Sequence, residues 1–325
     1  MGEGSNTDHH RSVTPDDWAD EAERRYARHQ VRLADHYGLD VASRTVDTDA
    51  TGRIHYLVAG DPDGEPVLLL HGLTYPAAGW MPMLPALADE YRLYLPDMPG
   101  EGLSAKPSYR GRDFRSYLVG YLTELLDRWG LDRTSVIANS FGGAQAFLLT
   151  IDHDRVARLG LVGAPVGLSL DFPLLARLLT MWGVNHVLMW GMTLGDPVEA
   201  ARRWTNQFVV DDSTIPETFH ELYAIRAELP GLQQSQRSLL LETGSFGRIS
   251  AQADLRAEVV GIDRPTTFIW GTEDYYWKPR VGRAVADRMA NADFHELLDH
   301  GHGPWLEPGD AAGTLVRSFL DASGG

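Results

Sequence analysis

Short apolar runs that are typical of buried strands alternate with helical patterns along most of this chain. The continuous apolar run VLLLHG, residues 67–72, predicts a strand that is buried on both faces of a parallel sheet. Further strand patterns occur at 91–97, 134–140, 156–164, 265–271 and 293–299, and helical patterns at 113–130, 142–152, 278–290 and 306–320. This alternation predicts βαβ units, and therefore an α/β fold with a mostly parallel, doubly wound sheet and helices on both faces.

The alternation is interrupted between about Pro165 and Ile262. Helical runs with several Trp and Met residues replace the strands there, and the segment is too long to be a loop. We therefore expect residues 41–164 and 263–325 to form one core, with residues 165–262 inserted between two of its strands as a helical cap.

The first 40 residues form an N-terminal extension. Thr14-Pro15-Asp16-Asp17 predicts the start of a helix, with Thr as the N-cap, Pro at the first helical position and an acidic residue at the third. Apolar residues then recur at helical spacing from Trp18 to Tyr37. The apolar face of this helix needs a partner surface, either the main domain or a second subunit in a homodimer, and packing within the chain is the simpler expectation.

Composition excludes several functions. The chain has no cysteine, so it has no disulfide framework, thiol nucleophile or thiolate metal site. Its net charge of −16 argues against nucleic acid as a partner. No apolar run approaches a membrane span and the N-terminus is polar, so we expect a cytoplasmic protein. Scattered histidines and the lack of nucleotide-binding motifs predict no metal and no cofactor.

The stretch VIANSFGGAQA, residues 136–146, places Ser140 between a strand pattern and a helix pattern. A serine at the tip of such a tight turn is exposed above the edge of the sheet, and small neighbours let the backbone fold sharply beneath it. The next backbone N–H and the N-terminus of the helix then point at the oxyanion that forms when the hydroxyl attacks a carbonyl carbon. Ser140 is therefore the candidate nucleophile.

A serine nucleophile needs a histidine as general base and an acid that orients it. Glu273 and Asp274 follow the strand pattern at 265–271, and His300 and His302 follow the last strand pattern. Asp171, downstream of the strand pattern at 156–164, is a further candidate acid. The chain order of serine, acid and histidine is the one expected for an α/β fold of this kind.

Five motifs in order resemble those of the α/β-hydrolase family, over about residues 45–322: HGLTYPAAGW, DMPGEGLS, ANSFGG, WGTED and GHGPWLEP. The resemblance implies Ser140 as the nucleophile, Asp274 as the orienting acid and His302 as the general base. It also implies the backbone N–H groups of Leu73 and Phe141 as oxyanion donors. The chain departs from the usual G-x-S-x-G pattern, because Ala138 stands at the first glycine.

The position of the cap over the strand ends predicts a largely apolar pocket for a small molecule. Met181, Trp182, Met189, Trp190 and Met192 are spaced to line one side of the cap, with core packing as the default role for most of them. We expect Trp80, Met181, Trp182 and Trp190 to contact the substrate.

The first functional hypothesis is a serine esterase that cleaves a small carboxylic ester through an acyl-enzyme. The alternative is a carbon–carbon bond hydrolase of ring-cleavage products, whose elbow is similar to NSFGG. The glycine-rich Ser-Gly-Pro-Gly loop of that group is replaced here by LTYP, residues 73–76, which weakens this alternative. A cofactor-free haloperoxidase or an acyltransferase would use the same triad, and a ligand-binding protein with an idle triad is the non-enzymatic alternative.

Overall fold

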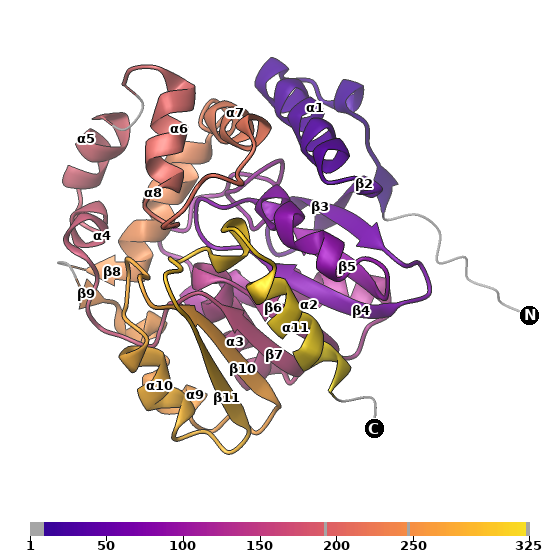
Figure 1. Cartoon of the computed structure of the whole chain (residues 1–325). Helices are drawn as coiled ribbons and strands as arrows, with labels where there is room; N and C mark the ends of the chain where they lie inside the picture. The colour runs from indigo at the N-terminus through magenta and orange to yellow at the C-terminus, as the bar shows by residue number, and fades with distance from the viewer. Residues whose placement is uncertain (1–9, 192–193, 246–247, 323–325) are drawn as a thin grey trace, which may run out of the picture.

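A nine-stranded sheet forms the centre of the protein, whose computed structural model describes residues 10–191, 194–245 and 248–322 (Figure 1). Its spatial order is β1-β2-β3-β5-β4-β6-β7-β10-β11. The strands are β1 (Arg11–Ser12), β2 (Val41–Thr48), β3 (Gly52–Gly60), β4 (Glu65–Leu70), β5 (Tyr91–Pro96), β6 (Thr134–Ala138), β7 (Val156–Val162), β10 (Thr266–Gly271) and β11 (Ala292–Leu297).

Parallel pairing joins six neighbouring strands of this sheet, in the order β5, β4, β6, β7, β10 and β11. At the other edge, β1, β2 and β3 pair antiparallel with one another, and β3 pairs antiparallel with β5. The run that predicted a strand buried on both faces is the central β4, in which Val67, Leu68, Leu69 and Leu70 are at most 1% exposed. Leu68 and Leu70 point into one apolar core and Val67 and Leu69 into the other, so both faces of β4 are covered. The α/β fold class with a mostly parallel sheet is confirmed.

Helices cover both faces of this sheet. One apolar core includes side chains of α2 (Phe114–Trp129), α3 (Ser140–His153), α9 (Arg256–Val259) and α10 (Arg280–Ala286). The other core includes α1 (Glu21–His36), α11 (Ala311–Asp321) and the 3-10 helices Ala77–Ala86 and Pro304–Leu306. The last predicted helix, 306–320, is therefore two elements, because a 3-10 turn precedes α11.

Between β7 and β10 the described chain is mainly helical. It contains α4 (Leu174–Leu179), α5 (Val184–Gly191), α6 (Pro197–Thr205), α7 (Glu217–Arg226), α8 (Leu232–Thr243) and then a 3-10 turn (Ala251–Ala253) and α9. In Figure 1, helices α4 to α8 gather on one side of the molecule. The sequence predicted no strand here, but β8 (Gly244–Ser245) and β9 (Arg248–Ile249) pair antiparallel. Strands of two residues are too short for periodicity to reveal.

The N-terminal helix begins later than the sequence predicted. Thr14 and Asp17 do form a capping box, but it starts a 3-10 turn, Pro15–Asp17, and the chain is extended at Trp18. Asp20 caps α1 proper, since its side chain accepts hydrogen bonds from the N–H groups of Ala22 and Glu23.

Helix α1 lies beside α7 of the inserted segment (Figure 1). Its Tyr26 and Leu33 are fully buried, and Arg25 forms an ion pair with Glu228 at 2.8 Å. The apolar face of α1 is therefore covered within the same chain, which removes the need for a second subunit to cover it. None of the helices in the described ranges combines the length and the apolar character needed to cross a membrane.

Candidate active site

Ser140 occupies a sharp turn between β6 and α3. Strand β6 ends at Ala138, Asn139 is the N-cap, and Ser140 is the first residue of α3 with φ of +51°. A non-glycine residue in this left-handed region is strained by on the order of 1–3 kcal/mol. The turn also requires Gly142, because a Cβ there would lie 2.2 Å from the Leu70 oxygen. Ala138 is fully buried within β6, so the methyl group that replaces the usual glycine fits.

Asn139 links this turn to two neighbouring segments. Its Nδ2 donates to the carbonyl oxygen of Val162 at 2.7 Å and to that of His302 at 3.3 Å. The side chain is buried, and it ties the serine turn to the end of β7 and to the loop after β11. Sequence analysis assigned Asn139 no role, because both of its acceptors are backbone atoms from distant parts of the chain.

Asp274 and His302 form a buried pair. Nδ1 of His302 lies 2.8 Å from Oδ2 of Asp274. The N–H groups of Tyr276 and Ala164 also donate to this carboxylate, at 2.8 Å and 3.1 Å. An ionised carboxylate only accepts hydrogen bonds, so Nδ1 of His302 is the donor, and in a neutral imidazole the lone pair is then on Nε2. This is the tautomer in which Nε2 can act as a base.

Nε2 of His302 is buried and has no hydrogen-bond partner in the part of the chain that the structure describes. Both Ser140 and His302 line one cavity of about 580 Å³. The structure therefore brings the three residues of the proposed triad to one site: a strained serine, a histidine with an unpaired nitrogen and the carboxylate that orients it.

The alternative acids and the alternative histidine lie elsewhere. Glu273 forms an ion pair with Lys278 at 3.0 Å. Asp171 pairs with Arg177 at 3.4 Å, and its carboxylate is largely exposed. Nδ1 of His300 hydrogen-bonds to the Leu298 oxygen, and His300 is not among the described residues that line the cavity.

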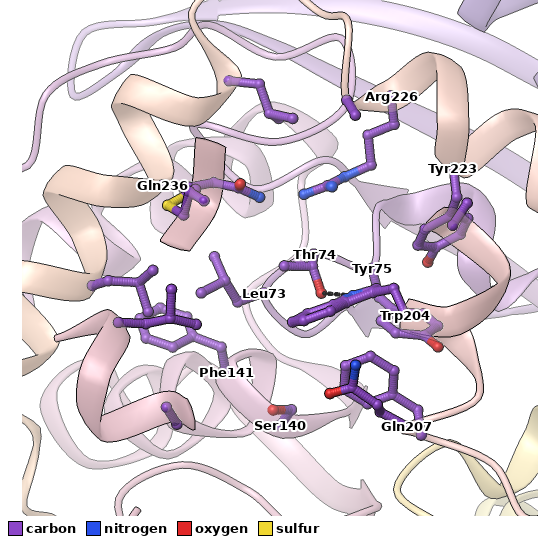
Figure 2. A pocket seen from close by; sticks show the side chains of 18 of the residues that line it. Leu73, Thr74, Tyr75, Ser140, Phe141, Trp204, Gln207, Tyr223, Arg226 and Gln236 are labelled. Atoms are coloured by element: carbon purple, nitrogen blue, oxygen red, sulfur yellow. Dashed lines mark hydrogen bonds between the residues drawn. The ribbon is translucent and has the colours of Figure 1, made fainter. Parts of the chain in front are cut away.

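Leu73 and Thr74 are the central residues of a hydrogen-bonded turn beside Ser140 (Figure 2). The Tyr75 N–H donates to the Gly72 oxygen at 3.2 Å, and Thr74 has φ of +72° while Leu73 does not have a positive φ. A positive φ at the third residue alone defines a type II turn, in which glycine is favoured at that position. Threonine is strained there by on the order of 1–3 kcal/mol. The two expected oxyanion donors, Leu73 and Phe141, both line the cavity.

Buried polar residues support this turn from below. His71 Nδ1 donates to the Gly72 oxygen and its Nε2 accepts the Met98 N–H, both at 2.8 Å, so the ring is neutral. Burial lowers the pKa of His71, which favours this state. Asp97 accepts hydrogen bonds from His55 and from the N–H groups of Ala77 and Leu103. Both residues thus hold loop backbone.

The four side chains that were expected to contact the substrate do not line this cavity. None of Trp80, Met181, Trp182 and Trp190 is among the described residues that line it. Trp80 is buried in the core, where its ring stacks on Trp305 at 4.4 Å, and Trp182 is 83% exposed. Met181 and Trp182 precede α5, and for Trp190 helical spacing does not reveal which face of α5 turns inward. Met189 is the described residue of the Met and Trp group that lines the cavity. Met192 lies outside the described residues.

Polar side chains of the inserted helices complete the cavity, and sequence analysis missed them. Trp204, Gln207, Arg226 and Gln236 surround the space above Ser140 (Figure 2). Apolar residues form much of the remaining wall, including Val166, Phe172, Leu179, Leu240 and Trp277. The cavity is thus apolar with a polar region near α7 and α8.

The described residues contain no group of three or more His, Asp or Glu side chains that could hold a metal ion.

The chain belongs to the alpha/beta hydrolase fold family, whose sequence pattern matches residues 65–308. With the serine turn and the Asp274–His302 pair, this membership identifies the class as an alpha/beta-fold serine hydrolase.

Curated relatives include a 2-hydroxymuconate semialdehyde hydrolase from Pseudomonas putida, with 30% identity over 79% of this chain and 88% of the relative. A 2-hydroxy-6-oxononadienedioate/2-hydroxy-6-oxononatrienedioate hydrolase from Paraburkholderia phymatum has 28% identity over 82% of this chain and 91% of its own.

Among solved structures, a carboxylesterase from Bacillus subtilis has a TM-score of 0.74 at 18% identity, covering 94% of this chain and all of its own. At such low identity, this likeness supports the fold alone.

Proposed function

We propose that this protein is a serine hydrolase in which Ser140 is the nucleophile, His302 the general base and Asp274 the acid that orients His302. The observation that carries the proposal is the unpaired Nε2 of His302, held by Asp274 and lining the same cavity as the strained Ser140. Backbone N–H groups of Leu73 and Phe141 are the proposed oxyanion donors.

The mechanism follows from these positions. His302 Nε2 takes the proton of Ser140 as Oγ attacks a carbonyl carbon, and the two N–H groups stabilise the oxyanion. When the tetrahedral intermediate collapses, His302 returns the proton to the leaving group and Ser140 carries the acyl group. His302 then deprotonates a water that attacks the acyl-enzyme. When the second tetrahedral intermediate collapses, His302 returns this proton to Ser140 Oγ and the acid product is released.

We propose a carbon–carbon bond in a ring-cleavage product as the first substrate candidate. Curated relatives with names of this kind match at 27–30% identity over roughly four fifths of the chain. In such a reaction the leaving group is carbon, so the electron pair of the broken bond must be delocalised into a conjugated carbonyl before that carbon is protonated. The polar region around Arg226 and Gln236 offers hydrogen-bond donors for the oxygen atoms of a substrate of this kind.

A carboxylic ester is the second candidate. The specific observation in its favour is the LTYP turn, which places a leucine and a strained threonine where the glycine-rich loop of the carbon–carbon bond hydrolases is expected. The largely apolar wall of the cavity suits the acyl chain or the alcohol of such an ester. Both reactions use the same three residues, so the choice concerns the leaving group.

A labelling experiment distinguishes a serine hydrolase from a ligand-binding protein whose triad is not catalytic. Ser140 should react with a fluorophosphonate probe in the folded wild type and not in Ser140→Ala. A known serine esterase in the same assay is the control. If it reacts while the folded wild type stays unlabelled, the serine hydrolase proposal fails and a ligand-binding protein becomes the better reading.

A comparison of substrates then decides whether the enzyme prefers to cleave a carbon–carbon bond or an ester bond. We expect kcat/KM for 2-hydroxy-6-oxo-dienoates to exceed that for a chain-length series of nitrophenyl esters. The opposite order would make the ester hydrolysis hypothesis the better one. Perhydrolysis and acyl transfer are tested in the same assay by adding hydrogen peroxide or an alcohol as the acceptor.

Two further assignments belong to this proposal. Residues 165–262 are proposed as a cap over the core formed by 41–164 and 263–325, because helices α4 to α8 supply much of the cavity wall. A homodimer through residues 1–40 has weaker support, since α1 packs on α7 of its own chain. Light scattering on the full chain and on a chain without residues 1–40 tests it.

A further inference from the structure

Glu101 connects the turn beside Ser140 to two inserted helices. It follows β5, it has no exposed surface, and its carboxylate accepts four hydrogen bonds. Oε1 accepts the Thr74 N–H at 3.2 Å and an Nε2–H of Gln236 on α8. Oε2 accepts Nε of Arg226 on α7 at 3.0 Å, and Nη2 of the same guanidinium. One side chain therefore joins three segments that are far apart in the sequence.

A buried carboxylate stays ionised only if nearby groups compensate its charge. The Arg226 guanidinium does so from α7, and its side chain is itself 8% exposed. Arg226 on α7 and Gln236 on α8 reach Glu101 with the two helices in their present positions. Three of the four hydrogen bonds to the Glu101 carboxylate therefore depend on how these helices are seated.

The direction of the Thr74 N–H distinguishes a type II turn from a type I turn at this place. This N–H belongs to the peptide between Leu73 and Thr74, which is the central peptide of the turn Gly72–Tyr75. Type I and type II turns differ by a flip of this central peptide. Threonine disfavours the type II form, so the observed form needs an acceptor that holds the N–H in its present direction. Glu101 provides that acceptor.

A second contact holds the same residue from the cap side. Trp204 on α6 donates its Nε1–H to the Thr74 hydroxyl at 3.1 Å, which Figure 2 shows as a dashed line. Thr74 is thus held through its backbone by Glu101 and through its side chain by Trp204. Leu73, the expected oxyanion donor, is the adjacent residue of the turn.

We propose that Glu101 is a positioning residue, which holds the Leu73–Thr74 peptide in its type II orientation and so couples the seating of α7 and α8 to the oxyanion site. This inference rests on the proposed function, because it assumes that the Leu73 N–H stabilises an oxyanion. Glu101 acts through Thr74.

The main test is Glu101→Gln, which keeps the size of the side chain and removes its charge. An amide cannot accept from all four donors, so the central peptide becomes free to flip. We expect kcat to fall on the order of 10- to 100-fold, less than the loss of a whole oxyanion donor, with KM changed less than about twofold. Affinity for a trifluoromethyl ketone, which forms a tetrahedral oxyanion adduct, should fall by the same factor as kcat/KM, whereas affinity for the acid product should not change.

A rescue experiment separates positioning from general stability. Glycine favours the positive φ that the turn needs, so Thr74→Gly in the Glu101→Gln background should restore at least half of the lost kcat on a logarithmic scale. The matched control is Glu124→Gln. Glu124 also accepts two backbone N–H bonds, from Asp49 and Ala50 at 2.8 Å, but in the turn between β2 and β3, so kcat and inhibitor affinity should stay at wild-type values.

Two additional measurements test the proposal if the Glu101→Gln variant does not fold or if no substrate is found. If Glu101→Gln does not fold, Trp204→Phe removes one donor to Thr74 and keeps an aromatic ring, and it should show the same pattern with a smaller loss of kcat. Amide hydrogen exchange over residues 72–75 needs no substrate, and exchange at Thr74 should become faster in Glu101→Gln and in Trp204→Phe.

The outcomes are distinguishable. Unchanged kcat and ketone affinity in folded Glu101→Gln, no rescue by Thr74→Gly, or unchanged exchange at Thr74 would each overturn the positioning role. A wild type that neither reacts with fluorophosphonate nor hydrolyses any substrate would instead overturn the proposed function, while the exchange measurement still decides whether Glu101 holds the turn.

Discussion

His302 and Asp274 lie 28 positions apart in the sequence, and yet Nδ1 of the histidine is 2.8 Å from Oδ2 of the aspartate. Asp274 follows β10 and His302 follows β11, and these strands are parallel neighbours, so their carboxyl ends meet at the same edge of the sheet. Asn139 joins the serine turn to the backbone of His302 at 3.3 Å. The carboxyl ends of β6, β10 and β11 thus bring Ser140, Asp274 and His302 to one site.

The first prediction concerns Asp274→Asn. The amide would keep the shape of the side chain but would favour the wrong tautomer of His302, so we expect kcat to fall about 10⁴-fold with little change in KM. Steady-state kinetics on the preferred substrate measures this. Glu273→Gln is the control, because Glu273 pairs with Lys278 on the surface and should leave kcat unchanged. Equal effects of the two variants would contradict the assignment of Asp274.

The second prediction uses the strain at Ser140. Ser140→Gly and Ser140→Ala should both abolish activity, but only glycine relieves the φ of +51°. We expect the glycine variant to be more stable than the alanine variant by about 1 kcal/mol, the cost of a Cβ in left-handed backbone. Urea unfolding of both variants measures the difference. In an unstrained helix alanine is the more stable residue by about 1 kcal/mol, so that order would show that the turn carries no strain.

A third prediction compares two helical glycines. Gly142→Ala should destabilise the protein by about 1–3 kcal/mol, because the new Cβ would lie 2.2 Å from the Leu70 oxygen and the backbone would have to move. Gly191→Ala at the end of α5 has no heavy atom within 4 Å of the added Cβ and should be neutral or stabilising by up to about 1 kcal/mol. Thermal unfolding of both variants tests the contrast, and an equal loss of stability at the two positions would refute it.

The fourth prediction concerns acid stability through Asp97. Burial alone would raise the pKa of this carboxyl, but the hydrogen bond and charge of His55 and the hydrogen bond from Leu103 together lower the pKa to about 2. Because the pKa of Asp97 is lower in the folded than in the unfolded protein, the ionised carboxylate stabilises the fold at pH values above its unfolded pKa, which is about 4. The contribution, about 2 kcal/mol, is lost as the pH falls from about 4 to about 2.

Asp97→Asn isolates this contribution. The variant should be less stable than wild type at pH 5, and the difference in unfolding free energy should shrink as the pH falls toward 2. Denaturant unfolding at several pH values gives the difference directly, and other carboxyls cancel because both proteins contain them. A difference that does not depend on pH would show that the charge of Asp97 does not stabilise the fold.

Sequence patterns predicted the strands and the serine turn well wherever the chain is regular. The strand at 67–72 and the turn at Ser140 both follow from local features, since buried parallel strands require continuous apolar runs and a tight turn requires small residues. The sequence predicted Asp274 and His302 because each follows a strand pattern and matches a family motif. The expectation that Trp182 lines the pocket differs from the structure, because Trp182 lies in the turn before α5 and is 83% exposed, and the spacing of apolar residues does not give the direction of the core.

The order of strands and helices, the place of the serine turn and the lack of thiol chemistry were determined by the sequence alone, because they depend on backbone preferences and side-chain types over a few neighbouring residues. The shape of the cavity and the partners of Glu101 were decided only by the tertiary structure. A buried carboxylate needs donors from wherever the packed chain supplies them, and Arg226 and Gln236 come from helices more than a hundred residues away.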